Sequence, residues 1–399
     1  MDSAQADTVP VIRIPNVQDT LDLTDLVHLR NVSPEALQKA AVTTDWLLFV
    51  GSNGTQDRIG DSVLIEEDRP MVFASFLMGI QPKDQTRLRS DFFAYWMRLH
   101  VVHEVMSKTS QQTTGLANFS WSAVKKLPLR YPSSTDEQAR IASAIRLADV
   151  AQQRAVNEER AATEVRSALL RSALFDVPEI DGRLPFKYSA LPAGWTLHKL
   201  GRLVNYRQLG TSEVADHGAS HTPILKMADL SFGELSLTNV EYVDAHKASA
   251  LSDFNLVDRD FLFNTRNTPE LVGKAAVWRG ERERCIFNNN ILRMRFDESI
   301  VIPEFMNLEF ASWRGRRRLR ALATGTTSVA AIYWQDLARV WIAVPDLETQ
   351  RAVVTQAEVA RQAQQCAAAK VRSLAELKRS LLKTMLTGEI RVPEAVLHA

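Results

Sequence analysis

Two long stretches of the chain carry apolar and small residues at helical spacing, and they predict its organisation. They cover residues 136–175 and 347–387, and neither contains proline or glycine until Pro178 and Gly388 supply stop signals. Alternating steps of four and three between the small and apolar positions are typical of a coiled-coil seam. The predicted seams comprise Ile141, Ile145, Ala148, Gln152, Ala155, Glu159, Ala162, Arg166, Leu169 and Ala173, and Val353, Ala357, Ala360, Gln364, Ala367, Val371, Leu374, Lys378, Leu381 and Met385.

Polar residues occupy matching positions in the two seams. Gln152 and Gln364 share one register, as do Arg166 and Lys378. Polar seam residues lower stability but can fix the register or orientation of a helix pair. We therefore predict that the two helices pack on each other. The alternative is a pair of separate surface helices, each packed on its own domain.

The residues ahead of each helix show a different pattern. Short apolar runs such as 46–50 and 261–263 are divided by glycine, asparagine, aspartate and proline, which favours strands joined by turns. Helical stretches are expected at 92–106 and 303–323. The predicted fold class is therefore α+β, with two globular domains separated by two long helices that form an antiparallel coiled coil. The predicted limits are 1–133 for the first domain, 134–176 for the first helix, 177–346 for the second domain, 347–388 for the second helix and 389–399 for the tail.

The chain repeats itself at an offset of about 213 residues. Single matches are weak, but an ordered series at nearly constant offset indicates tandem duplication. The matched positions are Pro10 with Pro223, Asn53 with Asn267, Gly60 with Gly273, Thr113 and Thr114 with Thr326 and Thr327, Trp121 with Trp334, Pro132 with Pro345, and Gln138 with Gln350.

The duplication predicts a geometry. A helix of roughly 38 residues spans about 57 Å at a rise of 1.5 Å per residue. One such helix after each domain implies an antiparallel pair with a globular domain at either end. B-DNA repeats about every 34–36 Å, so two such domains would reach sites more than one helical turn apart.

Composition excludes several classes of protein. Hydrophobic residues make up 45% of the 399 residues and charged residues 24%, which suits two globular domains with real cores. No apolar run is long enough for a membrane span, and the first ten residues do not have the pattern of a secretory signal. Cys285 and Cys366 lie in separate segments without CxxC spacing, so neither a disulfide framework nor a zinc site is expected. These features favour a reduced, cytoplasmic setting.

Charge is nearly balanced overall but unevenly distributed. The formal net charge is +1, whereas a nucleic-acid binder is often strongly basic. Residues 313–320 read WRGRRRLR, with five arginines in eight positions. This segment predicts a local basic face, and a solvated arginine-rich helix end is the equally weighted alternative.

Several segments resemble the specificity subunits of Type I restriction-modification systems. Residues 191–195 (LPAGW) followed by Leu200 and Gly201 look like the opening of a target-recognition domain in that family. Residues 262–267 (LFNTRN) with 270–273 (ELVG), the Gly/Thr loop at 324–327 and the helix ends at 167–175 and 380–389 are also similar to it, as is Pro345 ahead of Gln350 and Arg351. The likeness covers nearly the whole chain. One departure is that the second repeat has 32 residues, 191–222, ahead of Pro223, whereas the first has nine ahead of Pro10.

The resemblance implies a non-catalytic subunit that reads a bipartite DNA sequence. Base readout requires donors and acceptors that reach base edges, together with positive charge on the phosphates. Polar loops in both repeats supply these groups, and an ordinary solvated loop is the alternative for any single residue. The candidate DNA-contacting residues are Ser52, Asn53, Gln56, Arg58, Lys108, Gln111, Thr113, Thr114, Lys226, Thr265, Arg266, Asn267, Arg314, Arg316, Arg317, Thr326, Thr327 and Ser328. Residues 288–290 (NNN) are interpreted as turn formers rather than contacts.

Catalytic motifs are lacking in the sequence. It contains no GxGxxG, P-loop, HExxH or GxSxG pattern, and 287–290 lacks the prolines of an amino-methyltransferase motif. The resemblance assigns the chemistry to partners: two methyltransferase (modification) subunits, and restriction subunits that translocate and cleave DNA. S-adenosylmethionine, and ATP with magnesium, would be bound by those partners and not by this chain. The alternative function is a scaffold or inhibitory protein that binds modification subunits without reading DNA.

Overall fold

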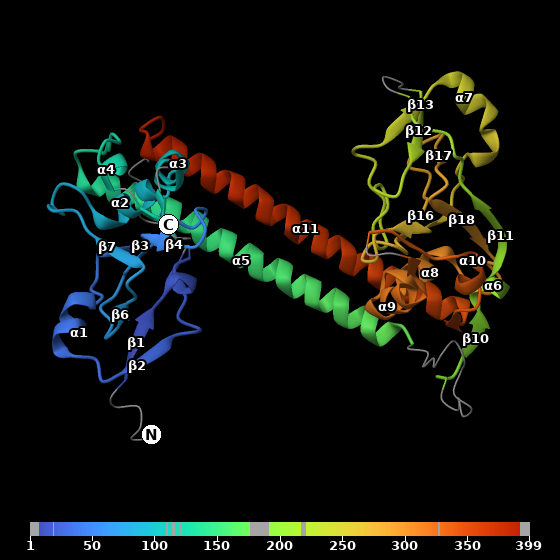
Figure 1. The fold of residues 1–399 in the computed structure, drawn as a ribbon, viewed down its shortest axis with the longest axis horizontal. Coiled ribbons are helices and arrows are strands. Elements are labelled where there is room, and N and C mark those ends of the chain that lie inside the picture. The colour runs from blue at the N-terminus through green and yellow to red at the C-terminus, as the bar shows by residue number, and fades with distance from the viewer. Residues whose placement is uncertain are drawn as a thin grey trace. The chain divides into compact units, whose positions relative to one another are not determined.

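The computed structural model describes residues 8–18, 20–108, 111–113, 116–119, 121–175, 191–216, 221–325 and 328–391. The chain forms two compact units (Figure 1). Unit 1 consists of residues 1–159 and 367–399, and unit 2 consists of residues 160–366. Each unit contains one mixed α+β head, together with part of both long helices. Head 1 refers below to residues 8–134, and head 2 to residues 191–346.

Within its described residues, head 1 contains three small sheets. In the first, β1 pairs antiparallel with β2 and parallel with β6. In the second, β3 lies between β5 and β7, and in the third β9 lies between β4 and β8. The elements are β1 (Thr8–Ile12), a 3-10 turn (Ile14–Asn16), β2 (Val27–Arg30), α1 (Pro34–Ala40), β3 (Leu47–Val50), β4 (Ser52–Asn53), β5 (Ser62–Leu64), β6 (Val72–Phe73), β7 (Leu77–Ile80), α2 (Ser90–Met97), α3 (His100–Lys108), β8 (Gln111–Thr113), β9 (Leu116–Asn118) and α4 (Trp121–Val124).

Head 2 repeats these sheets and extends them. Its elements are β10 (Trp195–Lys199), α6 (Leu200–Leu203), β11 (Val204–Leu209), β12 (Thr222–Leu225), β13 (Glu241–Val243), α7 (Ala245–Ala250), a 3-10 turn (Ser252–Phe254), β14 (Phe261–Asn264), β15 (Arg266–Asn267), β16 (Ala275–Val277), β17 (Ile286–Phe287), β18 (Ile291–Phe296), α8 (Pro303–Ala311), α9 (Trp313–Leu322), β19 (Thr324–Gly325), β20 (Ala330–Ala331), α10 (Trp334–Leu337) and β21 (Trp341–Pro345).

The predicted duplication is confirmed by the topology. Strand β12 pairs antiparallel with β13 and parallel with β17, as β1 does with β2 and β6. Strand β14 lies between β16 and β18, as β3 does between β5 and β7. The turn before each central strand contains a non-glycine residue at positive φ, Asp45 at 69° and Arg259 at 71°. The two heads therefore share the same strand pairing and, before the central strand, the same unfavourable backbone conformation.

Head 2 has one segment that the described part of head 1 does not repeat. Strand β10 pairs with β21, and β11 pairs with the outer edge of β18. The equivalent of β18 is β7, which is the last strand of its three-stranded sheet within the described residues. The additional residues at the start of the second repeat therefore supply edge strands for head 2.

Two predicted helical stretches are each broken into two helices. Residues 92–106 fall on α2 and α3, and 303–323 on α8 and α9, so the helical character predicted for both stretches is confirmed, and each stretch contains two helices. Ser312 causes the second break because its side-chain oxygen accepts a hydrogen bond from the Gly315 amide at 2.9 Å and starts α9. A Cβ atom on Gly315 would lie 1.9 Å from the Glu309 carbonyl oxygen, so this tight turn requires glycine. Helical periodicity continues across such a break and does not reveal it.

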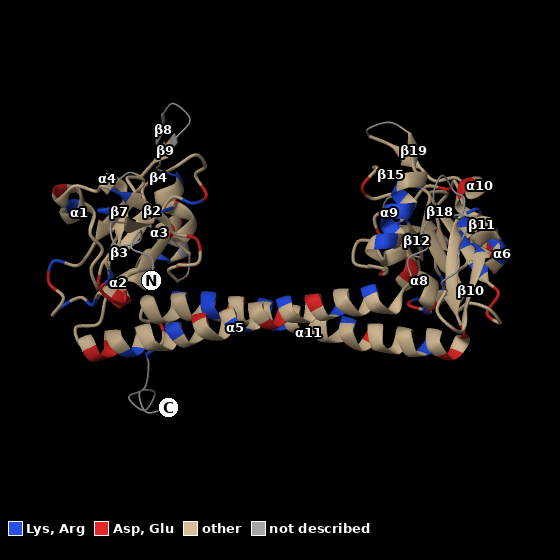
Figure 2. Ribbon diagram, turned by 90° about the horizontal axis from the view of Figure 1, so that it is seen from below, with Lys and Arg blue, Asp and Glu red and all other residues tan. Residues whose placement is uncertain are grey.

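The two long helices match the prediction closely. Helix α5 covers Thr135–Ala173 and α11 covers Leu347–Leu386, against predicted ranges of 136–175 and 347–387. Charged residues of both signs are interspersed along them (Figure 2). All of the predicted seam residues are buried or half-buried. Ala155, at the centre of the α5 seam, is completely buried.

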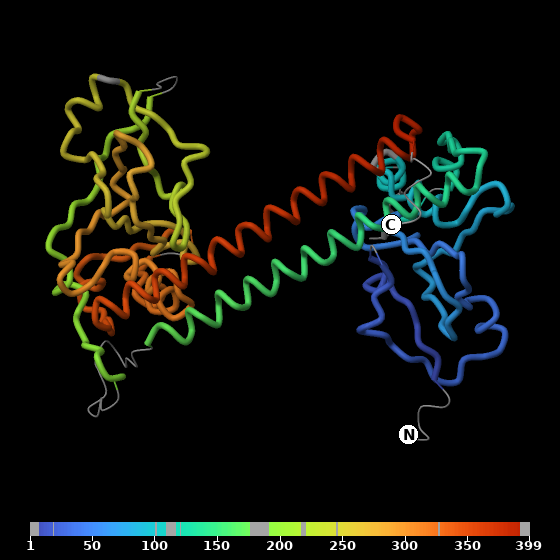
Figure 3. Tube along the Cα trace, turned by 180° about the vertical axis from the view of Figure 1, so that it is seen from behind, coloured from blue at the N-terminus to red at the C-terminus, as the bar shows by residue number. Residues whose placement is uncertain are grey.

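The helices run antiparallel within each unit, where their traces lie side by side (Figure 3). In unit 1, Lys378 forms an ion pair with Asp149 at 2.9 Å, and Lys370 forms one with Glu158 at 2.7 Å. From Lys370 to Lys378 the residue number rises along α11, while the number of the ion-pair partner on α5 falls from Glu158 to Asp149. The two helices therefore pack antiparallel. In unit 2, Gln364 accepts a hydrogen bond from Arg166 and donates one to Thr163, both at 3.0 Å. The alternative of two separate surface helices is therefore excluded.

Each head packs on both helices of its own unit. In unit 1, Phe92 and Tyr95 of α2 join one apolar cluster with Ile141 and Ile145 of α5 and Leu386 of α11. The Tyr95 hydroxyl also donates to Asp149 at 3.1 Å. In unit 2, the main core of head 2 includes Leu170, Ala173 and Leu174 at the end of α5, together with Leu347, Val353 and Val354 at the start of α11.

A buried glutamine joins each head to the start of the helix that follows it. Gln138 accepts a hydrogen bond from the Arg89 amide at 2.9 Å and donates to the carbonyl oxygens of Arg87 and Pro132, both at 2.8 Å. Gln350 makes the same set of bonds with the Ile302 amide and the Ile300 and Pro345 carbonyls, at 2.7–2.9 Å. Both glutamines are fully buried. One matched pair in the sequence repeat is thus a repeated structural joint.

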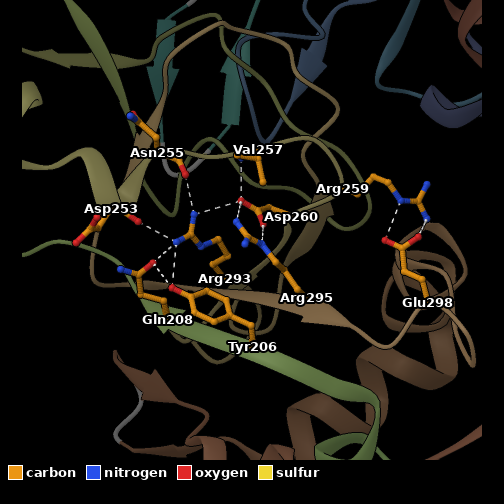
Figure 4. Close-up of polar contacts among 10 residues, drawn as sticks. All are labelled: Tyr206, Gln208, Asp253, Asn255, Val257, Arg259, Asp260, Arg293, Arg295 and Glu298. Atoms are coloured by element: carbon orange, nitrogen blue, oxygen red, sulfur yellow. Dashed lines mark hydrogen bonds and ion pairs between the residues drawn. The ribbon is translucent and has the colours of Figure 1, made fainter.

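Strand β11 is held to head 2 by a buried ionic network (Figure 4). Asp260 is completely buried and pairs with Arg293 at 3.3 Å and with Arg295 at 2.6 Å. Arg293 is 3% exposed and donates to the side chains of Tyr206 and Gln208 on β11. It also donates to the carbonyl oxygens of Asp253 and Asn255, at 2.9 and 2.7 Å. The arginine therefore connects β18, β11 and the turn before β14.

Head 1 replaces this network with an apolar contact. The strand registers place Gly79 where head 2 has Arg293, and Trp46 where it has Asp260. A Cβ atom on Gly79 would lie 2.3 Å from the Trp46 ring, so the indole occupies the space that the arginine fills in head 2. Head 1 thus has no buried arginine at this position that would need a neighbouring strand to satisfy it.

Both cysteines are free. Burial raises the pKa of the Cys285 thiol to about 12, whereas Cys366 is exposed. Among the described helices, none is both long and apolar enough to cross a membrane.

Loss of either buried glutamine should destabilise its own unit. We expect Gln138→Ala and Gln350→Ala each to lower the free energy of unfolding by about 2–3 kcal/mol, because a buried amide and two carbonyls lose their partner. Chemical denaturation with region-resolved hydrogen exchange measures the loss and assigns it to a unit. Gln365→Ala, an exposed glutamine on α11, is the matched control and should change stability by less than about 0.5 kcal/mol. A similar small effect for all three would show that the joints are not structural.

Removal of the buried carboxylate should release β11. We expect Asp260→Ala to cost about 3–5 kcal/mol, because it leaves Arg293 buried without a counter-charge. Exchange at the amides of Val204–Leu209 should accelerate, because Tyr206 and Gln208 depend on Arg293 for their position. Asp258→Ala, at an exposed neighbouring position, is the control. Unchanged protection of β11 in the Asp260 variant would contradict the assigned role.

Candidate nucleic-acid interface

The predicted polar loops of head 1 come together in one small sheet. Strand β3 leads through Gly51 into β4, which pairs with β9, and β9 pairs with β8. These three strands are called ribbon 1. Ser52 and Asn53 on β4 therefore belong to the same ribbon as Gln111 and Thr113 on β8. The sequence places these two segments more than 50 residues apart, and the fold brings them together. Thr114 lies outside the described residues.

Head 2 has the same arrangement, called ribbon 2. Strand β14 continues into β15, which pairs with β20, and β20 pairs with β19. Arg266 and Asn267 form β15, and the Arg266 side chain is exposed. Ser328 is also exposed and lies just ahead of β20. Thr326 and Thr327 lie outside the described residues.

Short contacts order the loop of ribbon 1. The Ser52 hydroxyl donates to Asn118 Oδ1 at 2.9 Å, and the Asn53 amide donates to the Thr55 carbonyl and hydroxyl oxygens. Gln56 is exposed, and its carbonyl oxygen accepts from the Ser107 hydroxyl at 3.1 Å. Exposed amide and hydroxyl groups are therefore presented from a loop whose backbone is fixed.

Arg58 stabilises this loop through contacts with neighbouring segments of head 1. Its guanidinium donates to Asp61 at 2.9 Å and to the Val17 carbonyl oxygen at 2.8 Å. His103 also contacts Asp61, at 3.3 Å. Burial opposes ionisation of Asp61, but the hydrogen bonds from His103 and Arg58 outweigh it and lower the pKa of the carboxyl. Arg58 thus positions the loop in this structure, in addition to its predicted contact with DNA.

A buried asparagine organises ribbon 2. The Asn264 amide nitrogen donates to the carbonyl oxygens of Arg266 and Asn290, at 2.9 and 3.1 Å, and its Oδ1 accepts from Asn267. The Thr265 hydroxyl donates to the same Asn290 carbonyl at 3.1 Å. Thr265 and Asn267 therefore hold the strand end, while Arg266 extends from it. Asn264 was not among the predicted site residues, although an asparagine directly after the apolar run 261–263 is a usable signal. Asn288 accepts from the Asn290 amide, which confirms the turn interpretation of 288–290.

The arginines of α9 separate into an inward and an outward group. Arg314 donates to the Leu174 carbonyl oxygen at 2.9 Å, at the carboxyl end of α5, where a cation is favourable. Arg318 pairs with Glu309 at 3.1 Å and donates to the Trp341 carbonyl oxygen. These two arginines stabilise the packing of head 2, so Arg314 has a structural role beside its predicted one.

The outward group forms a basic and aromatic stripe. Trp313, Arg316, Arg317 and Arg320 follow helical spacing on one exposed face of α9, called the α9 stripe. Arg317 lies over the Trp313 ring at 5.5 Å, and Arg316 lies over Phe232 at 5.1 Å. The basic residues of α9 are visible in Figure 2. Trp313 and Arg320 were not among the predicted site residues.

Head 1 carries its positive charge elsewhere. The counterpart of α9 is α3, whose Lys108 pairs with Glu104 of the same helix. Lys125 and Lys126 are exposed directly after α4, and Lys125 lies 6.0 Å from the Trp121 ring. In head 2, the predicted contact Lys226 pairs with Glu241. The lysine pair was missed, although the repeated tryptophan just ahead of it marks the position.

Among the described residues, no cluster of three or more histidine, cysteine, aspartate or glutamate side chains is placed to hold a metal ion. The described residues of the two ribbons offer mainly hydroxyl, amide and guanidinium groups. Such groups bind phosphates and base edges.

Comparison with known proteins relates this fold to one class of DNA-modifying systems. No family model matches the chain. A type I restriction enzyme MjaX specificity subunit from Methanocaldococcus jannaschii is 21% identical over 163 residues, which are 41% of this chain and 38% of that protein. The chain therefore spans less than half the length of the relative that it matches.

Two solved structures have a similar fold over almost the whole chain. The S subunit of a type I restriction-modification system from M. genitalium has a TM-score of 0.58 at 12% identity, covering 96% of this chain and 91% of that one. A chain from a study of complex assembly and conformational transition of the type I R-M system has a TM-score of 0.54 at 13% identity, with coverage of 96% and 92%. The resemblance indicated by the sequence motifs is thus confirmed, and the chain has the fold of a type I specificity subunit.

Proposed function

We propose that this chain is the specificity subunit of a type I restriction-modification complex. Each head reads one half of a divided duplex DNA target, with its ribbon directed at base edges. The chain itself performs no chemistry. Methylation and cleavage belong to partner subunits, which bind S-adenosylmethionine, and ATP with magnesium.

One observation carries this proposal: the same polar ribbon follows the same buried central strand in both heads. Strands β3 and β14 are completely buried, and each leads directly into a short strand of polar residues. A rigid strand that ends in a polar ribbon holds recognition groups in a fixed geometry, which sequence readout requires. Two such ribbons, one in each head, suit a DNA target that consists of two parts.

The α9 stripe supports binding to the DNA backbone. Arginine is well suited to bind phosphate, because its planar guanidinium can form two parallel hydrogen bonds with it. Arg316, Arg317 and Arg320 lead directly into β19 of ribbon 2, so phosphate contacts at the stripe would fix the register of the ribbon along the duplex. Lys125 and Lys126 would serve head 1 in the same way.

The long helices offer a surface for protein partners. In unit 1, Leu147 of α5 is more than 60% exposed, and in unit 2, Val165 of α5 and Val359 of α11 are each more than 60% exposed, so each unit has its own candidate surface. Exposed aliphatic residues on paired helices suit a protein interface better than contact with water. We assign these surfaces to two methyltransferase subunits, with restriction subunits joining in the full complex.

Methylation of a random DNA pool in the presence of the cognate modification subunits tests the function. Sequencing of the methylated molecules should return a motif in two parts with a fixed spacer. A motif of one part would restrict DNA reading to a single head. Methylation without any sequence preference would favour the alternative, a scaffold that binds modification subunits without reading DNA.

Loss of the α9 stripe should weaken binding in a salt-dependent way. We expect the triple variant Arg316→Ala, Arg317→Ala, Arg320→Ala to reduce the affinity for target DNA at least about tenfold, with the slope of log K against log salt less steep by roughly 2–3, because about three phosphate contacts are lost. Fluorescence anisotropy across a salt series measures both quantities.

The matched control removes three exposed arginines of unit 2 that lie on other elements: Arg202→Ala on α6, Arg284→Ala before β17 and Arg351→Ala on α11. This variant carries the same net charge and should retain the original slope. Equal losses in the two triple variants would mean that the chain binds DNA through its overall charge and not through the stripe.

A further inference from the structure

The outer face of ribbon 2 carries an exposed arginine. Strand pairing aligns Arg266, Ala331 and Thr324 in one row across the three strands, called the outer row. Successive side chains of a strand point to opposite faces, and the neighbouring Ala330 packs in the core of head 2, so the outer row lies on the face away from that core. Arg266 and Thr324 are both exposed. The Arg266 side chain therefore points away from the core.

The backbone around Arg266 is fixed on both sides. The Thr265 amide donates to the Asn290 carbonyl oxygen at 2.8 Å, and the Thr265 carbonyl oxygen accepts from the Ile332 amide at 2.9 Å. The side chain of the buried Asn264 donates to the Arg266 carbonyl oxygen at 2.9 Å. A long side chain that starts from a rigid backbone loses less freedom on binding, so its contacts can be specific.

The guanidinium of Arg266 is available for a ligand. Within the part of the chain that the structure describes, no hydrogen bond, ion pair or aromatic ring contact involves this side chain. Other arginines of head 2 are engaged internally, such as Arg295, which pairs with Asp260 at 2.6 Å. Arg266 therefore presents its planar set of N–H donors on the outer face of the ribbon.

Head 1 has a different group at this position. Ser52 and Arg266 are equivalent, because each is the second residue after a buried central strand, β3 or β14. Ser52 lies opposite Asn118 in ribbon 1, and its hydroxyl donates to Asn118 Oδ1 at 2.9 Å. Arg266 lies opposite Ala331, which has no polar side-chain atom. The serine is thus paired within its own ribbon, whereas the arginine is not.

The shape and chemistry of ribbon 2 match one base. The major groove of B-DNA admits a β-ribbon, and Figure 2 shows β15 and β19 at the end of head 2 that faces away from α11. In that groove guanine presents two neighbouring acceptors, O6 and N7, and one guanidinium can donate to both. Adenine presents one acceptor beside a donor, and neither pyrimidine presents two acceptors. An arginine on a ribbon in this groove therefore selects guanine.

We propose that Arg266 reads a guanine in the half of the target that head 2 recognises. This inference rests on the proposed function and adds the identity of one base to it. Arg266 donates to O6 and N7 of that guanine, while the α9 stripe, which leads into β19, contacts the phosphates. Ser52 has a single hydroxyl proton and cannot form this pair of bonds. The requirement for this guanine thus belongs to one half of the target only.

Methylation of a random DNA pool by the complex with its modification subunits tests the proposal. With Arg266→Ala, one invariant guanine in one half of the motif should fall to near-random frequency, while every other position is retained. Arg320→Ala, the same substitution on the α9 stripe, is the matched control and should lower methylation of all sequences without changing the motif. The same unchanged motif in the Arg266 variant would identify a phosphate contact and overturn the proposal. Methylation without sequence preference by the unaltered complex would overturn the proposed function and this inference together.

Base analogues locate the contact on the guanine. 7-Deazaguanine lacks N7 but still pairs with cytosine, whereas inosine lacks only the amino group that lies in the minor groove. For the unaltered complex, 7-deazaguanine at the invariant position should weaken binding roughly tenfold, and inosine should leave it unchanged. The Arg266→Ala complex should bind guanine and 7-deazaguanine DNA equally. A loss with 7-deazaguanine that persists in the variant would assign the base to another residue and overturn the proposal.

Discussion

The structure depends on how the first turn of each long helix is fixed to the head that precedes it. A helix can hold a domain in a defined orientation only if its first turn is fixed, and here the fixing groups are the buried amides of Gln138 and Gln350. A neutral amide suits this position because it supplies both a donor and an acceptor without the cost of burying a charge. Each amide joins three backbone groups from two segments, so a hinge at this point would require three hydrogen bonds to break together. The head and the first turns of its helix therefore move as one body.

Most of the architecture could be predicted because it follows from regular spacing. The seams of α5 and α11 are periodic, and a periodic pattern can be recognised in a single sequence. The duplication was recognisable from matched polar residues such as Gln138 and Gln350. These residues recur because each makes specific hydrogen bonds at its position, and not because of its size. The breaks at Arg98 and Ser312 could not be found in this way, because helical spacing continues through them.

The candidate site was predicted in its parts but not in its assembly. The sequence indicated Ser52, Asn53, Gln111 and Thr113 as polar loop residues, and only the fold shows that they share a ribbon. The arginines of α9 were treated as one group, although helical spacing already separates Arg314 and Arg318 from the outer stripe. Their inward contacts involve Leu174, Glu309 and Trp341, which lie far from one another in the sequence. Such partners cannot be inferred from local pattern.

The two heads show how one backbone plan accommodates different side chains. Head 2 fills one core position with Arg293 and Asp260 and needs Tyr206 and Gln208 of β11 to complete the network. Head 1 fills the same position with Trp46 over Gly79, which requires no further partner. A buried ionic network is stable only if every strand that contributes a hydrogen bond to it is in place. An aromatic contact has no such requirement. This difference explains why the duplicated sheets can end differently at β7 and β18 while their central strands remain alike.

The division of each helix between two units has a consequence for folding. Unit 1 is completed by residues of α11 that follow head 2 in the chain, since Leu382, Met385 and Leu386 pack against Phe92 and Ile141. Head 1 is therefore made early in the sequence but cannot bury this surface until the last helix is available. Long-range closure of this kind is slow compared with local helix formation. The ion pair of the seam residue Lys378 with Asp149, whose side chains are largely buried, favours one register at that late step, because an alanine-rich seam distinguishes poorly between registers. Polar seam residues thus contribute specificity where apolar packing alone leaves the alignment open.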